Sequence, residues 1–170
     1  MEGVLFSGQT VEFTKTALEY CLLMEHVREE KEEVFLDKMS KVLPLLYLKV
    51  MLVPEMAEYQ ESELEIGVTE DKYTRVAQGV AELLGDKDLF LETFHPDMQY
   101  SDTPVAVTIS ENLADIYQDL GNFIAVFQLG NPETMNDALF VCLQNFKDYW
   151  GQKLVNVLRA IHSLKNKTIE

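Results

Sequence analysis

Three polar side chains stand beside the hydrophobic row of the last predicted helix and are the first candidates for chemistry. Tyr149, Lys153 and Asn156 are separated by four and three residues, so they share one row of a helical surface. The lysine has to extend its ammonium group to water or meet a carboxylate, because an isolated buried charge is very costly. Lys153 could therefore form a structural ion pair, line a ligand-binding pocket or act as a catalytic amine.

The carboxylates that could meet Lys153 lie on the preceding predicted helix, which a short turn joins to the last one. Helices with so short a connection pack antiparallel, which brings Asp115 and Asp119 near the lysine. Asp119 flanks the apolar face of its helix, whereas Asp115 points more nearly away, so we expect Asp119 to be the partner. Together with Glu111 these acids recur at steps of four, a spacing typical of a solvated face and conceivable for cation binding.

His95 raises the question of a metal site. It follows Glu92 by three residues, which is half of the motif found in carboxylate-bridged di-metal bundles. Neither of the other two histidines follows a glutamate at that spacing, which argues strongly against a di-metal centre. The turn-rich loop around His95 could instead form a mononuclear site with Asp97 and Asp102, or these residues could have surface and capping roles. We predict no metal and no cofactor.

These two regions together define one candidate binding cluster. Its members are His95, Asp97, Asp119, Tyr149, Lys153 and Asn156. No catalytic residue is assigned, because the sequence contains no phosphate-binding loop, no dinucleotide fingerprint and no nucleophile elbow. Cys21 and Cys142 sit among apolar residues, where a free thiol behaves as a small hydrophobe, and this usage indicates a reduced, cytoplasmic setting.

The charge of the chain limits its partners. Its 170 residues include 29 acidic and 14 basic side chains, which gives a formal net charge of −15. A negative field of this size repels nucleic acids and anionic lipids, so we expect neither as a partner; it keeps the protein dispersed and could attract a basic protein. The sequence also shows no apolar run long enough to span a membrane and no signal-peptide pattern at its start.

Amphipathic helices are the elements that must position these side chains. Apolar residues recur at steps of three and four through most of the chain, and the pattern predicts helices over residues 10–27, 32–52, 69–85, 88–94, 108–130 and 131–164. The last should continue through Gly151 for about 32 residues, because burial of its apolar row outweighs a glycine penalty of about 1 kcal/mol. The sequence thus predicts one all-α domain, residues 1–170, built as a bundle of five to six helices with a long C-terminal helix.

Three stretches depart from this regular pattern. Residues 42–53 are apolar nearly all round, which is typical of a helix central to a bundle, and Pro44 should kink or split that helix. Residues 54–66 contain five glutamates and no base, so we interpret them as an exposed acidic loop or a loosely held arm. Residues 104–108 form the single, weak candidate for a strand.

A further pattern lies in three segments, HPDMQYSD at 95–102, LADIYQDL at 113–120 and YWGQKLVN at 149–156. Together they resemble a family of small acidic bacterial proteins that is classed as a domain of unknown function. The likeness covers roughly residues 11–164 and implies a helical bacterial protein of the cytoplasm. It brings no activity, cofactor, ligand or functional residue with it.

These observations favour a non-enzymatic interaction module, an acidic helical bundle that binds a protein partner or assembles with itself. The missing catalytic motifs and the acidic arm support this interpretation. The alternative is a small-molecule or metal-binding protein, or an enzyme, with a polar pocket around Lys153 and Asp119. That alternative predicts that the residues of the candidate cluster converge on one cavity.

Overall fold

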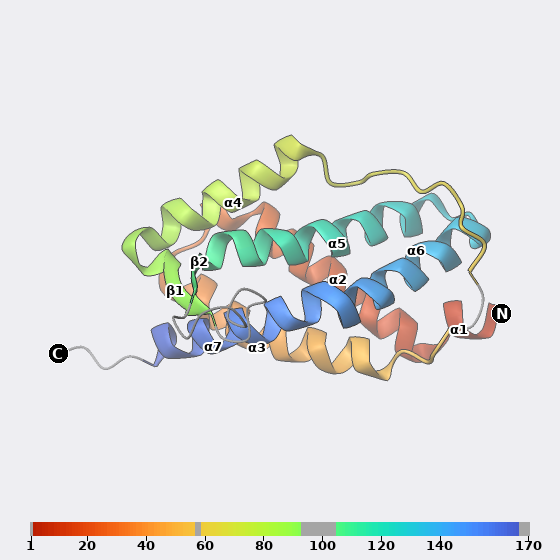
Figure 1. Cartoon of the computed structure of the whole chain (residues 1–170), viewed down its shortest axis with the longest axis horizontal. Coiled ribbons are helices and arrows are strands. Elements are labelled where there is room, and N and C mark those ends of the chain that lie inside the picture. The colour runs from red at the N-terminus through yellow and green to blue at the C-terminus, as the bar shows by residue number, and fades with distance from the viewer. Residues whose placement is uncertain (1, 57–58, 93–104, 167–170) are drawn as a thin grey trace.

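Long helices lying side by side form the body of the molecule (Figure 1). The computed structural model describes residues 2–56, 59–92 and 105–166. Its α-helices are α1 (Glu2–Leu5), α2 (Gly8–Glu25), α3 (Glu32–Leu52), α4 (Glu70–Leu84), α5 (Ile109–Leu129), α6 (Pro132–Asn145) and α7 (Gly151–Lys165). Within these ranges every helix is too short or too polar to cross a lipid bilayer. The predicted all-α bundle is confirmed.

Three helices begin directly after a residue whose side chain caps the first turn. The side chains of Thr69, Thr108 and Asn131 each accept a hydrogen bond from a backbone N–H in the first turn of α4, α5 and α6 respectively. A cap of this kind stabilises a helix by about 1 kcal/mol. Gly130 ends α5 with a φ of 76°, a left-handed conformation that glycine adopts without strain.

The core lies around α5, which packs against α2, α4, α6 and α7. The rings of Phe13 on α2 and Phe123 on α5 stack with their centroids 5.5 Å apart. The buried hydroxyl of Tyr20 donates a hydrogen bond of 2.6 Å to the carbonyl oxygen of Leu113. Because a buried tyrosine needs such a partner, this bond fixes α2 against the first half of α5.

α3 spans the predicted residues but does not have the predicted place in the bundle. It is continuous through Pro44, so the expected split does not occur. Leu43 and Leu46 on its inner side are buried, whereas Leu45 and Leu48 on its outer side are exposed. α3 packs against α2 and α7 and therefore lies at the edge of the bundle. The prediction of a central helix is wrong because apolar residues on all sides of a helix do not require that every side is buried, and the outer side of α3 is exposed.

α6 and α7 form one nearly continuous rod, as the unbroken apolar row predicts. A π-helical turn, Phe146–Trp150, joins them, and the Trp150 indole N–H donates a hydrogen bond of 3.0 Å to the carbonyl oxygen of Cys142. Gly151 follows this turn directly, and a Cβ atom there would lie 2.5 Å from the carbonyl oxygen of Phe146. The glycine therefore gives room to the extra residue of the π turn and does not end the helix.

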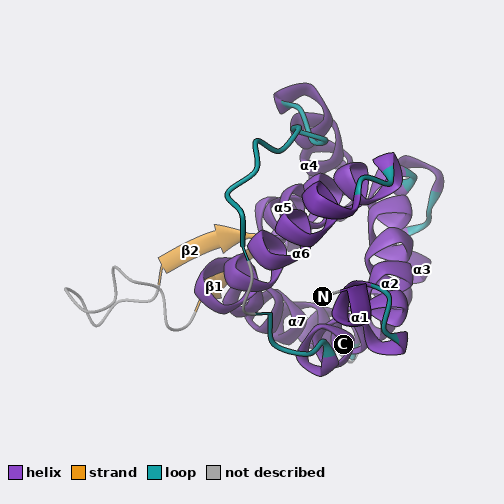
Figure 2. Ribbon diagram, turned by 90° about the vertical axis from the view of Figure 1, so that its right-hand side faces the viewer, coloured by secondary structure: helices purple, strands orange, loops and turns teal. Residues whose placement is uncertain are grey.

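The predicted short helix over residues 88–94 is wrong for the described part of that range. Residues Leu89–Glu92 form strand β1, which pairs antiparallel with strand β2, residues Val105–Thr108. Figure 2 shows this hairpin beside the helices. The weak strand candidate over residues 104–108 is thus confirmed for its last four residues. The helix prediction for β1 is wrong because the periodicity of so short an apolar run fits a helix and a strand equally well.

The acidic segment 59–66 is exposed, as predicted, but it is not loosely held. The buried carboxylate of Asp137 accepts hydrogen bonds of 3.0 and 2.8 Å from two backbone N–H groups of the segment. The ring of Tyr59 stacks on that of Phe140, with centroids 4.6 Å apart. Segment 59–66 is therefore held by side chains of α6 and by hydrogen bonds from its own backbone amides. Its glutamate-rich composition does not predict these contacts.

Candidate functional site

Lys153 is held in an ion pair, but with Asp115 and not with Asp119. Its Nζ atom lies 3.1 Å from Oδ2 of Asp115, and the two side chains are only 24% and 17% exposed. The other carboxylate oxygen accepts a hydrogen bond of 2.6 Å from the hydroxyl of Tyr73. The Asp115 carboxylate therefore ties α4, α5 and α7 together.

The predicted pairing with Asp119 is wrong because of how the helices are positioned relative to each other along their axes. The rod of α6 and α7 runs antiparallel to α5, and Asn145 of α6 is level with Asp119, to which its Nδ2 donates a hydrogen bond of 2.9 Å. Lys153 lies about two turns further along the rod. Its ammonium group meets Asp115, which comes one turn earlier on α5. The direction of each side chain around α5 was not enough to choose between the two acids.

Two tyrosines complete the surroundings of the ion pair. The Lys153 Nζ atom lies 4.9 Å from the ring centroid of Tyr149. Burial and the Asp115 carboxylate raise the pKa of both Tyr73 and Tyr149 well above its usual range, so both phenols stay protonated at neutral pH. The cluster thus consists of a cation and an anion in contact, with hydroxyl donors around them. Both charges of the Lys153–Asp115 pair therefore have a partner within the fold.

Asn156 belongs to a different contact. It is buried, and its Nδ2 donates a hydrogen bond of 3.2 Å to Oε1 of the buried Glu92 at the end of β1. One helical turn away, the guanidinium of Arg159 donates to the carbonyl oxygen of Leu91. These two α7 side chains fasten β1 to the bundle. The structure therefore places Asn156 against the hairpin, while His95 and Asp97 lie outside the described residues.

Asp119 stands at a small cavity. The cavity has a volume of about 160 Å³ and lies between residues 64–66, α5 and α6. Burial raises the pKa of Asp119; the hydrogen bond from Asn145 opposes this, and the negative charge of Asp115 adds to it. Of the predicted cluster, the structure brings Tyr149 and Lys153 together and gives Asp119 and Asn156 other partners.

Neither cysteine has the surroundings of a reactive thiol. Cys21 and Cys142 are free and buried, as their apolar sequence context predicts. Burial raises the pKa of both thiols above its ordinary value, which keeps them protonated. Among the described residues, no three histidine, cysteine or acidic side chains gather closely enough to hold a metal ion.

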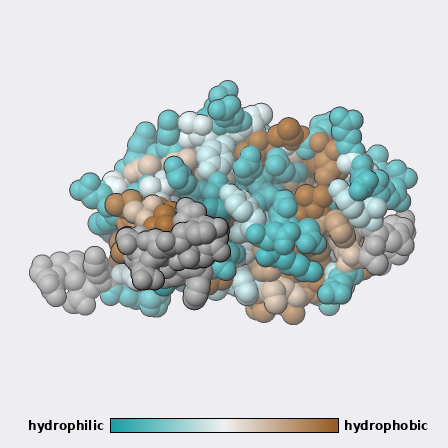
Figure 3. Space-filling model, in the orientation of Figure 1, coloured by the Kyte–Doolittle hydropathy of each residue, from teal (hydrophilic) through white to brown (hydrophobic). Residues whose placement is uncertain are grey.

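The outer side of α3 is the surface that the sequence interpretation missed. It carries Leu45, Leu48, Met51 and Leu52, which are between 44% and 58% exposed, and we call this row the α3 face. Figure 3 shows apolar surface along the lower edge of the molecule, over the C-terminal part of α3. The sequence signal for this face is the apolar stretch 42–53, whose pattern is equally typical of a buried helix.

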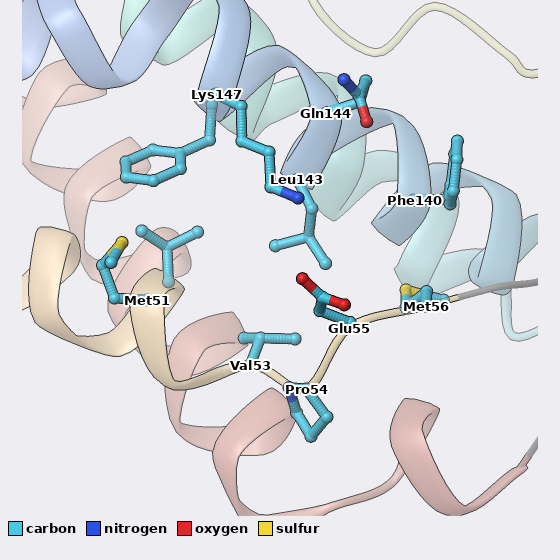
Figure 4. Close-up of a pocket in the computed structure, with 11 residues that line it drawn as sticks. Met51, Val53, Pro54, Glu55, Met56, Phe140, Leu143, Gln144 and Lys147 are labelled. Atoms are coloured by element: carbon cyan, nitrogen blue, oxygen red, sulfur yellow. The ribbon is translucent and has the colours of Figure 1, made fainter.

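The α3 face continues into a groove of about 450 Å³ between the end of α3 and α6 (Figure 4). We call it the Met51 groove. Met51 belongs to both surfaces, and Met56, Leu143 and other apolar residues line the groove. In Figure 4 the Glu55 carboxylate and the Lys147 ammonium group point into it from opposite walls. An apolar cleft of this size with a few polar groups is the usual form of a binding surface.

Fold and surface together define a helical bundle with a long C-terminal rod and an exposed apolar surface at its edge. The chain belongs to the family described as domain of unknown function DUF5063, whose family model matches residues 4–167. It is similar to protein BF1032 from Bacteroides fragilis, known from a crystal structure, with 41% sequence identity over 98% of each chain and a TM-score of 0.86. No match is found among curated proteins.

Proposed function

We propose that this protein is a non-enzymatic interaction module that docks a protein through the α3 face and the Met51 groove, with a second copy of the chain as the favoured partner. The observation that carries the proposal is the row of four large, roughly half-exposed apolar side chains on one helix. Soluble monomers rarely leave a contiguous apolar surface of this kind in water unless a partner covers it.

The Met51 groove is suited to receive an apolar side chain of that partner. Methionine is flexible and polarizable, so Met51 and Met56 can adjust their shape around a side chain that enters the groove. Glu55 and Lys147 place one charge of each sign inside the same space. Such a pair of charges fixes the orientation of a partner without favouring a strongly acidic or a strongly basic one.

The local charge favours a second copy over an unrelated basic protein. Residues 38–54 contain three lysines and no acid, and each lysine forms an ion pair with a carboxylate of the same chain. The α3 face is therefore nearly neutral on a chain with a net charge of −15. Two copies that meet through this face keep their acidic surfaces apart, and salt screens the remaining repulsion over about 8 Å at physiological ionic strength.

We place this module in the bacterial cytoplasm. The similarity to a protein from Bacteroides fragilis and the two free, buried cysteines support that setting. The net charge of −15 argues against nucleic acid as a partner.

The test is the mass of the protein in solution, measured by light scattering over a range of concentrations. We expect a dimer that dissociates on dilution, and we expect Leu48→Glu to be monomeric, because it places a charge in the middle of the α3 face. Leu22→Glu is the matched control: Leu22 is 42% exposed on α2, outside the α3 face, and this change should leave the dimer intact.

A monomeric wild-type protein at the highest accessible concentration contradicts self-association. If pull-down with the wild-type chain also recovers no protein that Leu48→Glu fails to bind, the whole proposal of an interaction module is wrong. Loss of the dimer in Leu22→Glu as well as in Leu48→Glu would assign the effect to charge or folding and not to the α3 face.

A further inference from the structure

Asp119 is a half-buried carboxylate that meets no cation among the residues that the structure describes. Asp115, one turn earlier, has the ammonium group of Lys153 and the hydroxyl of Tyr73 as partners. Within the described part of the chain, the one hydrogen bond to Asp119 comes from the neutral amide of Asn145, to Oδ1. Burial of a carboxylate without a cation is unfavourable, so this site gains from any positive charge that can reach it.

The cavity beside Asp119 gives such a charge a place. Its walls are apolar and include Phe123, Val126 and Ala138, which are at most 3% exposed. Its volume of about 160 Å³ is close to that of an apolar cavity known to hold one benzene molecule, roughly 150 Å³. Glu65 also lines the cavity and adds a second negative charge. The space therefore combines a carboxylate with room for a small apolar group.

Two polar groups at the cavity can accept a hydrogen bond from a ligand, whereas the Oδ1 atom of a third, Asn122, already accepts two backbone hydrogen bonds. Oδ2 of Asp119 can accept a hydrogen bond, and so can the amide oxygen of Asn145, because the Nδ2 of that amide is already directed to Asp119. A primary ammonium group has three N–H donors and one positive charge, and matches both acceptors. A coordinated metal ion fits less well, since no cluster of three metal-binding side chains exists among the described residues.

We propose that the cavity between residues 64–66, α5 and α6 binds a small organic ammonium ion, with its ammonium group on Asp119 and Asn145 and its apolar body against Phe123 and Ala138. This site is separate from the α3 face, so it can be correct or wrong independently of the interaction module. It retains Asp119 from the predicted polar cluster and excludes Lys153, whose charge already has a partner.

Benzylammonium and its neutral counterpart benzyl alcohol form the test pair, with affinity measured by calorimetry and location by amide chemical shifts. We expect the wild-type protein to bind benzylammonium at least tenfold more tightly than benzyl alcohol. Asp119→Asn should remove this preference, whereas Asp148→Asn, a change of an exposed carboxylate on the π turn, should preserve it. Ala138→Leu should weaken both ligands, because its side chain fills the cavity.

Four results would overturn the proposal. Equal affinity for the amine and the alcohol would mean that Asp119 contributes nothing to recognition. An equal loss of benzylammonium binding in Asp119→Asn and Asp148→Asn would show diffuse attraction to the acidic surface. Chemical shift changes confined to residues away from α5 and α6, or no change at millimolar benzylammonium, would exclude the cavity as the binding site.

Discussion

Two aspartates one turn apart on α5 have opposite surroundings. Asp115 lies where α4, α5 and α7 meet and has an ammonium group at 3.1 Å and a phenol at 2.6 Å. Asp119 lies where α5, α6 and residues 64–66 meet and has an amide at 2.9 Å and a cavity beside it. An aspartate therefore ties three helices together at one position of α5, and one turn later an aspartate has no cation beside it among the described residues.

This difference shows that a polar residue within an apolar pattern is not by itself a sign of function. Lys153 breaks the pattern most clearly, and its charge is used within the fold. Asp119 looked like its partner and is the acid that still lacks a cation among the described residues. A charge that the fold leaves unmatched is the better indication of a ligand, because ligand binding then relieves an unfavourable burial.

Removal of Asp115 should have the largest effect on stability. Asp115→Ala leaves the Lys153 ammonium group and the Tyr73 hydroxyl without their shared acceptor, so we expect a loss of about 3 kcal/mol in the free energy of unfolding. Urea denaturation monitored by circular dichroism measures this change. Gln118→Ala, at an exposed position of the same helix, should change it by less than about 0.5 kcal/mol. A loss below about 1 kcal/mol for Asp115→Ala would show that water replaces the ion pair without strain.

The loss of Lys153 should have a smaller effect. Lys153→Met keeps the apolar stem and removes the charge, and Asp115 still accepts the hydrogen bond from Tyr73. We expect a loss of about 1–2 kcal/mol, less than for fully buried pairs because Lys153 is 24% exposed. The control is Lys15→Met at an exposed position of α2, which should be nearly neutral. If Lys153→Met raises stability, the ion pair lowers the free energy of unfolding, and its role is limited to fixing the orientation of the helices.

Much of the fold could be predicted because its signals are local. The caps at Thr69, Thr108 and Asn131 are satisfied by backbone groups two or three residues away, so the sequence contains both partners. The continuous C-terminal rod follows from its apolar row. The hairpin was only half predicted. Its two strands are separated by residues 93–104, and β1 has too few residues for its hydrophobic period to distinguish a strand from a helix.

The candidate site was less predictable because it depends on the relative positions of the helices along their axes. A helical wheel gives the direction of Asp115 and Asp119 around α5 but not which of them Lys153 reaches along it. The attachment of residues 59–66 to Asp137 depends on backbone N–H groups, which every sequence has. The α3 face was hidden for a different reason, since its residues agree with the apolar pattern and differ from core residues only in what covers them.

Replacement of Asp119 should change the free energy of unfolding in the opposite direction from replacement of Asp115. Asp119→Asn removes an unfavourably buried charge and keeps an oxygen that can accept the hydrogen bond from Asn145. We expect the free energy of unfolding to rise at pH 7, by less than about 1 kcal/mol because Asp119 is only partly shielded from water. The same urea denaturation measures it, with Asp148→Asn as the exposed control. A clear loss of stability would mean that the charge of Asp119 has a partner after all.

The pH dependence of the stability gained by Asp119→Asn is the most sensitive test of the difference between Asp115 and Asp119. Burial raises the pKa of Asp119 in the folded protein above its value in the unfolded chain, so the folded state binds the proton more readily. The penalty of the charge is fully present above the raised pKa and disappears as the pH falls through it toward about 3.9, the ordinary value for aspartate. The difference in stability between Asp119→Asn and the wild-type protein should therefore shrink from pH 7 to pH 4. A difference that stays constant over this range cannot come from ionisation of Asp119 and would assign the gain to packing of the amide.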